Sequence, residues 1–228
     1  MLIASGSVRV NGRPPPPTGM LVQPGVDEVT VDGKPVEVSE RHRYLVLNKP
    51  AGVITTARDP GRRPTVLEIL PPEVQAGRLF PVGRLDVDTT GLLLLTDDGE
   101  LAHRLAHPRH KVAKEYLALV SGVPGERDLR RLREGIDLED GRTQPAEAEL
   151  VAARGSLAQV RIVLTEGRNR QVRRMFESVG HPVKGLHRTA FGPIHLGRLR
   201  SGSVRRLRPA EVESLRGAAG LGPGEGNR

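Results

Sequence analysis

The chain has 228 residues and a net charge of +8, with 37% hydrophobic and 27% charged side chains. This length fits one large domain, or a large domain with a small appendage. No apolar stretch approaches the 18 residues of a membrane span, cysteine is absent, and the N-terminus has no basic segment before an apolar run. We therefore expect a soluble, cytoplasmic globular protein without membrane contact, disulfides, iron–sulfur clusters or thiol catalysis.

The excess positive charge lies in the C-terminal third of the chain. Residues 151–228 contain 15 Lys and Arg against 5 Asp and Glu, whereas residues 1–150 contain 20 against 22. All but five of the 35 basic residues are arginines, whose planar guanidinium groups suit phosphates and stack on bases. This favours a polyanionic partner, although a GC-rich genome that replaces Lys by Arg would give the same composition.

Residues 1–38 are expected to form a small β-rich piece. Apolar residues alternate around Val8–Gly12 and again over Glu28–Val36, where Asp32-Gly33 is typical of a tight hairpin turn. Four prolines at 14–17 separate the two stretches. The piece is too small to hold a large core, so it is either an appended module or the first strands of the main domain.

The main domain is expected over residues 42–216. Apolar runs predict strands at 44–50, 92–95, 116–120 and 157–164, and the remaining patterns predict helices at 98–106, 127–133 and 169–179. The irregular order of strands and helices favours an α+β fold on a mixed, largely antiparallel sheet. Residues 217–228 contain five glycines and a proline, and are predicted to be a disordered tail.

The most unusual stretch is Gly83–Gly91, which places Asp86 and Asp88 in a glycine-bracketed loop just before a predicted buried strand. A rigid strand can fix such a loop while the loop meets solvent, so it could hold a catalytic aspartate.

Four interpretations of this loop compete. Asp86-x-Asp88-x-Thr90 fits a phosphotransferase nucleophile, but there the strand precedes the first Asp. A calcium loop ending at Asp97 would have leucines in its middle. Asp86 with Asp88 or Asp97 could be a glycosidase-like pair, whose separation the sequence does not give. A lone Asp in a turn most often caps backbone amides.

A basic segment, Glu166–Phe176, supplies a possible partner for the carboxylate. Asn169 is predicted to cap a helix in which Arg170 and Arg173 share a face. One guanidinium could pair with the Asp and keep it ionised while others face phosphates. Taken alone, a basic helix is more often a solvated face.

Tyr116 is one of only two tyrosines and opens a predicted strand behind a polar segment. It could stack on a base, although core packing is the commoner role of a single Tyr.

His103, His107 and His110 have helical spacing, but Pro108 interrupts the helix and no suitable acid joins them, so no metal site is predicted. Phosphate-cradling and dinucleotide fingerprints are absent, and the sequence indicates no cofactor.

Together these segments resemble the pseudouridine synthases, most closely those that modify bacterial ribosomal RNA. The resemblance covers about residues 42–212 and rests on six matching pieces in family order: Asn48–Val53, Gly83–Thr96, His107–Arg109, Lys114–Tyr116, Glu166–Met175 and Leu186–Arg188. It implies a mixed sheet flanked by helices. Residues 1–38 resemble the later part of an S4-type RNA-binding module, without most of the two helices that lead that module.

The resemblance also implies roles for individual residues. Asp86 corresponds to the catalytic aspartate, Tyr116 to the tyrosine that stacks on the target base, and Arg173 to the basic residue paired with the aspartate. Arg84 resembles the arginine that fills the gap left by an extruded nucleotide. The residues expected to bind RNA are Lys49, Arg84, Arg168, Arg170, Arg174 and Arg188.

The implied activity is isomerisation of a specific uridine in ribosomal RNA to pseudouridine by an aspartate nucleophile, without a cofactor. Thr89-Thr90 looks more like small-subunit enzymes and Glu166–Arg170 more like large-subunit ones, which slightly favours 23S over 16S rRNA. We expect a monomer that acts alone on ribosomal RNA, free or within an assembly intermediate. The alternative is a ribosome-associated RNA-binding protein without catalysis.

Overall fold

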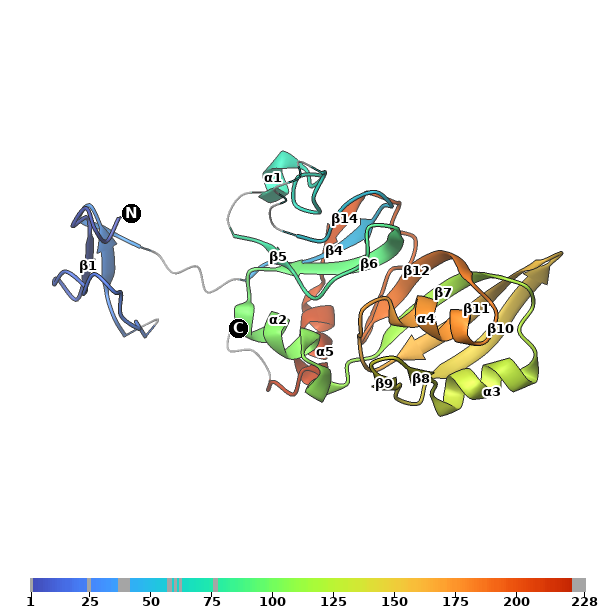
Figure 1. Ribbon diagram of the computed structural model, residues 1–228. Helices are drawn as coiled ribbons and strands as arrows, with labels where there is room; N and C mark the ends of the chain where they lie inside the picture. The colour runs from blue at the N-terminus through green and yellow to red at the C-terminus, as the bar shows by residue number, and fades with distance from the viewer. Residues whose placement is uncertain are drawn as a thin grey trace. The chain divides into compact units, whose positions relative to one another are not determined.

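The computed structural model of the protein (Figure 1) describes residues 2–23, 26–36, 42–56, 59, 61, 63–75 and 78–222. The chain divides into two compact units, Met1–Arg41 and His42–Arg228. The predicted boundary between the N-terminal piece, residues 1–38, and the main domain, residues 42–216, is at 39–41, which lies outside the described residues.

The first unit contains a small antiparallel sheet of three strands in the order β1-β2-β3. These are β1 (Val8–Val10), β2 (Val29–Val31) and β3 (Lys34–Pro35). Asp32 and Gly33, between β2 and β3, have φ values of 51° and 75°. Two left-handed residues in a row are what a tight two-residue hairpin turn requires, so the predicted hairpin is confirmed.

The second unit is built on a nine-stranded sheet with the path β10-β11-β7-β12-β6-β4-β14, to which β13 and β5 add short pairings. All neighbouring strands are antiparallel except β12 and β6. The prediction of a mixed, largely antiparallel sheet is therefore confirmed. The strands are β4 (Tyr44–Lys49), β5 (Phe80–Pro81), β6 (Thr89–Thr96), β7 (Lys114–Ser121), β10 (Glu147–Arg154), β11 (Leu157–Leu164), β12 (Val183–Phe191), β13 (Ile194–His195) and β14 (Val204–Arg206).

Helices lie on both faces of this sheet, which completes the α+β fold (Figure 1). They are α1 (Pro72–Gln75), α2 (Gly99–Ala106), the 3-10 turn Pro108–His110, α3 (Glu126–Glu134), α4 (Gln171–Ser178) and α5 (Pro209–Ala218). A separate hairpin pairs β8 (Asp137–Leu138) with β9 (Gly141–Arg142). Within the described part of the chain, none of the helices has the length and apolar content needed to cross a membrane.

The C-terminal helix corrects the predicted tail. Residues 217 and 218 complete α5, and Ala219 is fully buried beside Leu215 of the same helix. The predicted disorder from residue 217 is therefore wrong as far as residue 222, because the end of α5 packs into a core that the glycine-rich composition does not reveal. Residues 223–228 lie outside the described residues.

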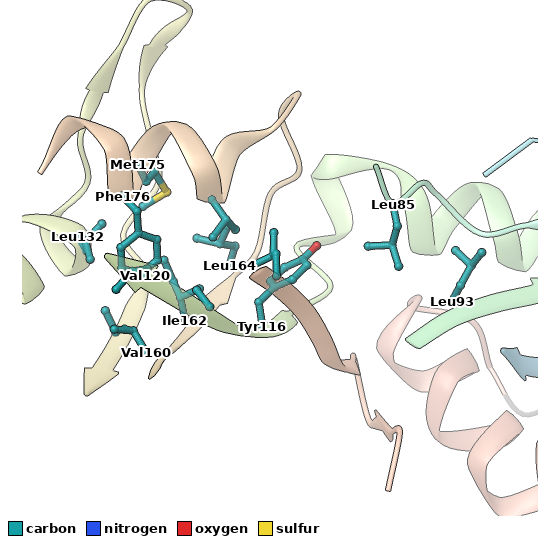
Figure 2. Close-up of a cluster of buried hydrophobic side chains, with 14 of the residues drawn as sticks. Leu85, Leu93, Tyr116, Val120, Leu132, Val160, Ile162, Leu164, Met175 and Phe176 are labelled. Atoms are coloured by element: carbon teal, nitrogen blue, oxygen red, sulfur yellow. The ribbon is translucent and has the colours of Figure 1, made fainter. Parts of the chain in front are cut away.

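The central strands β4 and β6 are buried on both faces, because alternate side chains of a strand point to opposite sides. Leu93 and Leu95 pack into a core covered by α3 and α4, whereas Leu92 and Leu94 pack into a second core covered by α2 and α5. Figure 2 shows the first of these cores running from Phe176 to Leu93, with Tyr116 near its middle. The four-leucine run is thus a buried strand, as predicted.

The parallel contact between β6 and β12 requires a glycine. Gly91 lies opposite Arg188 and has a φ of 104°, which side-chain-bearing residues rarely adopt. A Cβ atom at this position would lie 2.3 Å from the carbonyl oxygen of Arg188 and 2.6 Å from its nitrogen. The absence of a side chain at Gly91 therefore lets the late strand β12 approach the strand that follows the Asp86 loop.

Candidate active site

A pocket of about 390 Å³ opens where the Asp86 loop, the start of α4 and strands β7 and β12 meet. This volume lies in the range of about 300 to 1,000 Å³ that is typical of small-molecule sites. Sequence segments more than a hundred residues apart contribute to its walls. The lining residues include Arg84, Asp86, Lys114, Tyr116, Leu164, Glu166, Arg168, Arg170, Leu186, Arg188 and Phe191.

The floor of the pocket is the face of the sheet between β7 and β12. Tyr116 lies opposite Arg188, and Lys114 lies opposite Phe191. The register shifts between Arg188 and Ala190, and this bulge lets Arg188 and Phe191, three positions apart, both reach the pocket. Tyr116 is 9% exposed and belongs to the core as well as to the floor (Figure 2), so its two proposed roles are compatible.

The loop that carries Asp86 is held from below by a buried lysine. The Lys49 side chain is 0% exposed, and its Nζ donates to the carbonyl oxygens of Thr89 at 2.9 Å, Pro50 at 3.1 Å and Val87 at 3.3 Å. Burial lowers the pKa of Lys49 to about 8, and the nearby carboxylates of Asp88 and Asp86 oppose that shift. Lys49 therefore anchors the loop, and the prediction that it binds RNA is wrong because no part of it reaches the surface.

Two residues of the segment after β4 form further hydrogen bonds to the same loop. The Thr55 hydroxyl donates to the carbonyl of Leu85 at 2.8 Å and accepts from the Leu85 amide at 3.2 Å, and the Gly52 amide donates to Val87 at 2.8 Å. These bonds bracket Asp86 on both sides and limit the positions that its carboxylate can take. The sequence pattern gave no signal for Thr55, which lies in a segment with the composition of a loop.

Asp86 and Asp88 face the two arginines that were expected to share a helix face. Arg170 Nη1 lies 3.7 Å from Asp86 and 3.6 Å from Asp88, and Arg173 Nη2 lies 2.9 Å from Asp88. Arg173 is therefore paired with Asp88, which corrects the expected pairing with Asp86. The guanidinium nearest to Asp86 is that of Arg170.

The backbone around Arg170 explains this arrangement. Helix α4 begins at Gln171, and the residue before it is Arg170, with a left-handed φ of 47° and no side-chain cap. The prediction that Asn169 caps the helix is wrong. The left-handed turn directs the Arg170 side chain out of the helix and toward the Asp86 loop, and a strained backbone of this kind is often found at functional sites.

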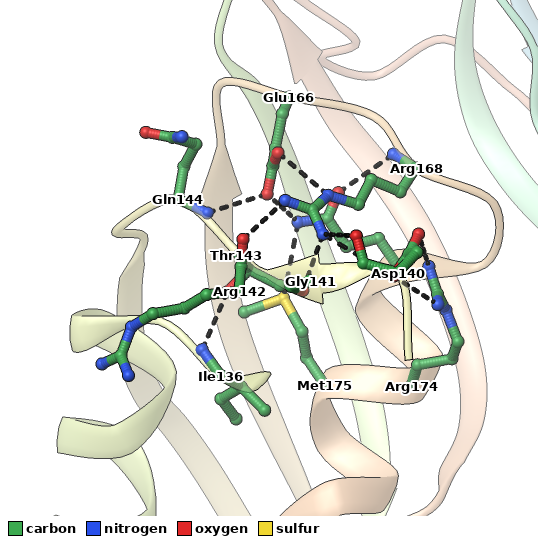
Figure 3. A network of polar contacts seen from close by, with 11 residues as sticks. Ile136, Asp140, Gly141, Arg142, Thr143, Gln144, Glu166, Arg168, Arg174 and Met175 are labelled. Atoms are coloured by element: carbon green, nitrogen blue, oxygen red, sulfur yellow. Dashed lines mark hydrogen bonds and ion pairs between the residues drawn. The ribbon is translucent and has the colours of Figure 1, made fainter. Parts of the chain in front are cut away.

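The other two arginines of this segment bind the protein itself (Figure 3). Arg168 donates to the carbonyls of residues 140, 141 and 142 and to Glu166, and Arg174 forms two hydrogen bonds, at 2.8 and 3.0 Å, with Asp140. These contacts fasten the β8–β9 hairpin to the start of α4. Arg168 and Arg174 therefore have a structural role in the protein itself, and their predicted contact with RNA stays a prediction.

The remaining predicted residues occupy different levels of the pocket. Arg84 is exposed at its rim, whereas Arg188 is 1% exposed at its floor. Asp97, which the calcium-loop interpretation required and which the glycosidase interpretation offered as an alternative to Asp88, lies beyond the far end of β6 and pairs with Arg43 at 2.8 Å. The calcium-loop interpretation is therefore wrong, and so is a glycosidase-like pair of Asp86 with Asp97. Among the described residues, no group of three or more His, Asp or Glu converges as metal ligands would.

Replacing Lys49 by Met tests its role as an anchor. We expect uridine conversion to slow by about 100-fold, the cost of a small misplacement of a reacting group, while RNA affinity stays within about threefold of the unmodified protein. Single-turnover rates and filter binding separate the two effects. A large loss of affinity with little change in rate would restore the RNA-binding role instead.

Comparison with known proteins agrees with this geometry. The family model described as RNA pseudouridylate synthase matches residues 43–178. An uncharacterized RNA pseudouridine synthase of Aquifex aeolicus is 46% identical over 96% of this chain and 88% of its own length, and ribosomal large subunit pseudouridine synthase B of Bacillus subtilis is 44% identical over 97% and 90%. A crystal structure of a pseudouridylate synthase superposes with a TM-score of 0.71 at 34% identity and covers 94% of this chain and 90% of its own.

The chain therefore belongs to the RNA pseudouridine synthase family. Its fold is the pseudouridine synthase fold. The interpretation of Asp86 as a phosphotransferase nucleophile and the alternative of an RNA-binding protein without catalysis are therefore wrong.

Proposed function

We propose that this enzyme converts a uridine of large-subunit ribosomal RNA into pseudouridine with Asp86 as its nucleophile. The observation that carries the proposal is the single pocket shared by Asp86, Tyr116 and Arg170. Further support for a large-subunit target comes from the Bacillus subtilis relative, a ribosomal large subunit pseudouridine synthase B that this chain matches over nearly its full length.

The reaction balances with no added reagent. The bond between N1 and C1′ breaks, and its electron pair stays with the uracil ring. In one route, C1′ meanwhile forms a bond to an Asp86 oxygen. In two alternative routes, the sugar passes through a glycal, or Asp86 adds first to C6 of the uracil ring. After the ring turns, C5 bonds to C1′, C5 releases a proton and N1 gains one. Tyr116 stacks on the base throughout, which offsets part of the cost of extruding the nucleotide.

The exposed basic side chains around the pocket have different proposed roles. Arg84 at the rim would enter the space left by the extruded nucleotide. Arg170, 47% exposed, would hold the Asp86 carboxylate and remain open to the RNA backbone. The N-terminal unit, which resembles part of an S4-type module in its sequence, would add contacts outside the pocket.

A turn rich in arginine adds a candidate phosphate surface. The Asn48 side chain donates to the carbonyl of Leu199 at 2.8 Å, which places the 199–203 turn at the same end of β4 as Lys49 and the Asp86 loop. Arg198 and Arg200 are exposed at this turn, and Arg206 is exposed at the end of β14, opposite Leu45. They would bind phosphates of an RNA whose target base lies in the pocket.

Substitution of these three arginines by Gln tests that surface. Because each lost phosphate contact lowers the slope of log affinity against log salt by about 0.7 to 0.9, the slope should fall by about 2. The matched control replaces Arg127, Arg130 and Arg131 of α3, which are exposed near the opposite edge of the sheet. Equal slopes for both triple variants would remove this turn from the RNA interface.

The target itself is found by mapping pseudouridine in 23S and 16S transcripts after incubation with the purified protein. We expect one new site, in 23S rRNA, formed in the presence of EDTA. A new site only in 16S rRNA would overturn the subunit assignment, and no new site in either, free or in assembly intermediates, would overturn the ribosomal substrate.

A further inference from the structure

Two cations at the floor of the pocket lack the partners that buried charges usually have. In the described part of the chain, Arg188 donates from Nε to the carbonyl of Leu92 at 2.7 Å, while its buried Nη2 has no hydrogen-bond partner. Lys114 donates to the carbonyl of Val112 at 3.0 Å. Buried charges are normally paired, because removing them from water costs free energy that only a partner can offset.

The two cations also lie against the same aromatic ring. The Arg188 Cζ lies 5.2 Å and the Lys114 Nζ 5.5 Å from the centroid of the same Phe191 ring. Burial and, to a smaller extent, the charge of Arg188 lower the pKa of Lys114 to about 8, while Glu166 acts in the opposite direction. Such an arrangement is unfavourable in the empty pocket and becomes favourable when an electron-rich group lies between the cations.

Resting on the proposed function, we propose that Arg188 and Lys114 bind the carbonyl oxygens of the extruded uracil and stabilise the negative charge that its ring gains during the reaction. Donors placed in advance where charge develops are among the largest contributions to enzymatic rates. Neither residue needs to move a proton for this role.

The chemistry requires such stabilisation by every route open to Asp86. When N1 separates from C1′, the electron pair left on the ring spreads from N1 onto O2 and O4. When a carboxylate adds to C6 instead, the charge moves through C5 to O4. In each case the carbonyl oxygens become more negative in the transition state than in the bound uridine, so cations beside them accelerate the reaction more than they tighten binding.

The position of the cations favours the base over a phosphate. Arg188 lies directly across the strand pair from Tyr116, the predicted stacking residue, and both Arg188 and Lys114 sit on the floor formed by β7 and β12. The exposed Arg84 and Arg170 occupy the rim, where the RNA backbone must pass. A base inserted between these levels presents its carbonyl edge to the floor and keeps its phosphates at the surface.

Replacing Lys114 by Met removes the charge and keeps an unbranched side chain. The substrate is the rRNA fragment on which the unaltered enzyme is active. On this fragment we expect the single-turnover rate to fall about 100-fold, while the RNA affinity stays within about threefold of that of the unaltered enzyme. Thermal stability should stay equal or rise, since a buried charge is lost. Because Lys114 titrates near pH 8 when folded and near 10.5 when unfolded, the gain should be fully present below pH 8 and vanish by about pH 10.5.

Two companion variants complete the set. Lys114→Arg should recover much of the rate because it restores the charge, whereas Arg188→Met, which removes the other charge, should slow the reaction in the same way as Lys114→Met. Lys111→Met, which removes an exposed lysine three residues away, is the control and should leave rate and affinity unchanged. Circular dichroism melts check that each variant is folded.

A substrate with 5-fluorouridine at the target position gives the decisive measurement, in which the rate followed is that of N1–C1′ bond cleavage, because C5 of this base carries fluorine and has no proton to release. Fluorine withdraws electrons, so the departing ring anion needs less help, and the rate loss of Lys114→Met should shrink from about 100-fold to about 10-fold or less. An equal rate loss for Lys114→Met on both substrates would overturn this role. A rate of Lys114→Met within threefold of that of the unaltered enzyme, or a rate loss explained by weaker RNA binding, would also overturn it. Failure of the unaltered enzyme to form pseudouridine would instead overturn the proposed function.

Discussion

Asn in place of Asp86 is expected to abolish pseudouridine formation, with a rate loss of at least about 10⁴-fold, the scale seen when a reacting group is removed from a catalytic unit. The Asp86 carboxylate lines the pocket that also contains Tyr116, and the amide that replaces it cannot attack carbon. RNA affinity should change by no more than a few fold. Single-turnover conversion and filter binding, on the same rRNA fragment, measure the two effects.

The neighbouring carboxylate provides a matched control. Asp88→Asn removes the partner of Arg173 at 2.9 Å but leaves Asp86 in place, so we expect a loss of no more than about 100-fold through misplacement of the loop. If Asp88→Asn proved inactive and Asp86→Asn active, the two carboxylates would exchange roles. Arg173 would then be the guanidinium that pairs with the nucleophile.

Replacing Gly91 by Ala is expected to destabilise the second unit by about 3 to 5 kcal/mol or to prevent folding, because strain at a special backbone position adds to a steric clash. The new Cβ would lie 2.3 Å from the backbone of Arg188, in the contact that joins β6 to β12. Urea denaturation measures the loss, which is a large share of the stability of an ordinary domain.

Gly185→Ala, on the same strand β12, is the control for this substitution. Its nearest neighbour would be Leu119 Cβ at 3.7 Å, an ordinary contact, so the change should stay within about 1 kcal/mol. Equal unfolding midpoints for the two variants would show that the β6–β12 contact adapts to a side chain.

Much of the fold could be predicted from local patterns. Asp32-Gly33 and the run Leu92–Leu95 carry strong signals, since turn chemistry and apolar runs act over a few residues. Strands β10 and β12 were missed. Most of β10 is exposed at the sheet edge, and polar residues such as His187 and Arg188 interrupt the apolar alternation of β12.

The site could be predicted in part of its membership but not in its pairings. Asp86, Tyr116 and Arg173 were expected to form the catalytic group; the pocket is lined by Asp86 and Tyr116, but its arginine beside Asp86 is Arg170 and not Arg173. The pairing of guanidinium groups with carboxylates depends on the left-handed backbone at Arg170, and no residue pattern predicts that conformation. The burial of Lys49 depends on carbonyls nearly forty residues later in the chain, so long-range packing decides it.

The order of strands in the main sheet constrains how this protein can be made. Strand β12 lies between β6 and β7 but is synthesised long after both, so a chain still emerging from the ribosome must keep a gap open in the middle of its sheet. Until residues 183–191 arrive, two central strands offer unpaired edges to other chains. Prematurely terminated products should therefore aggregate, and activity should arise only after almost the whole domain has left the exit tunnel.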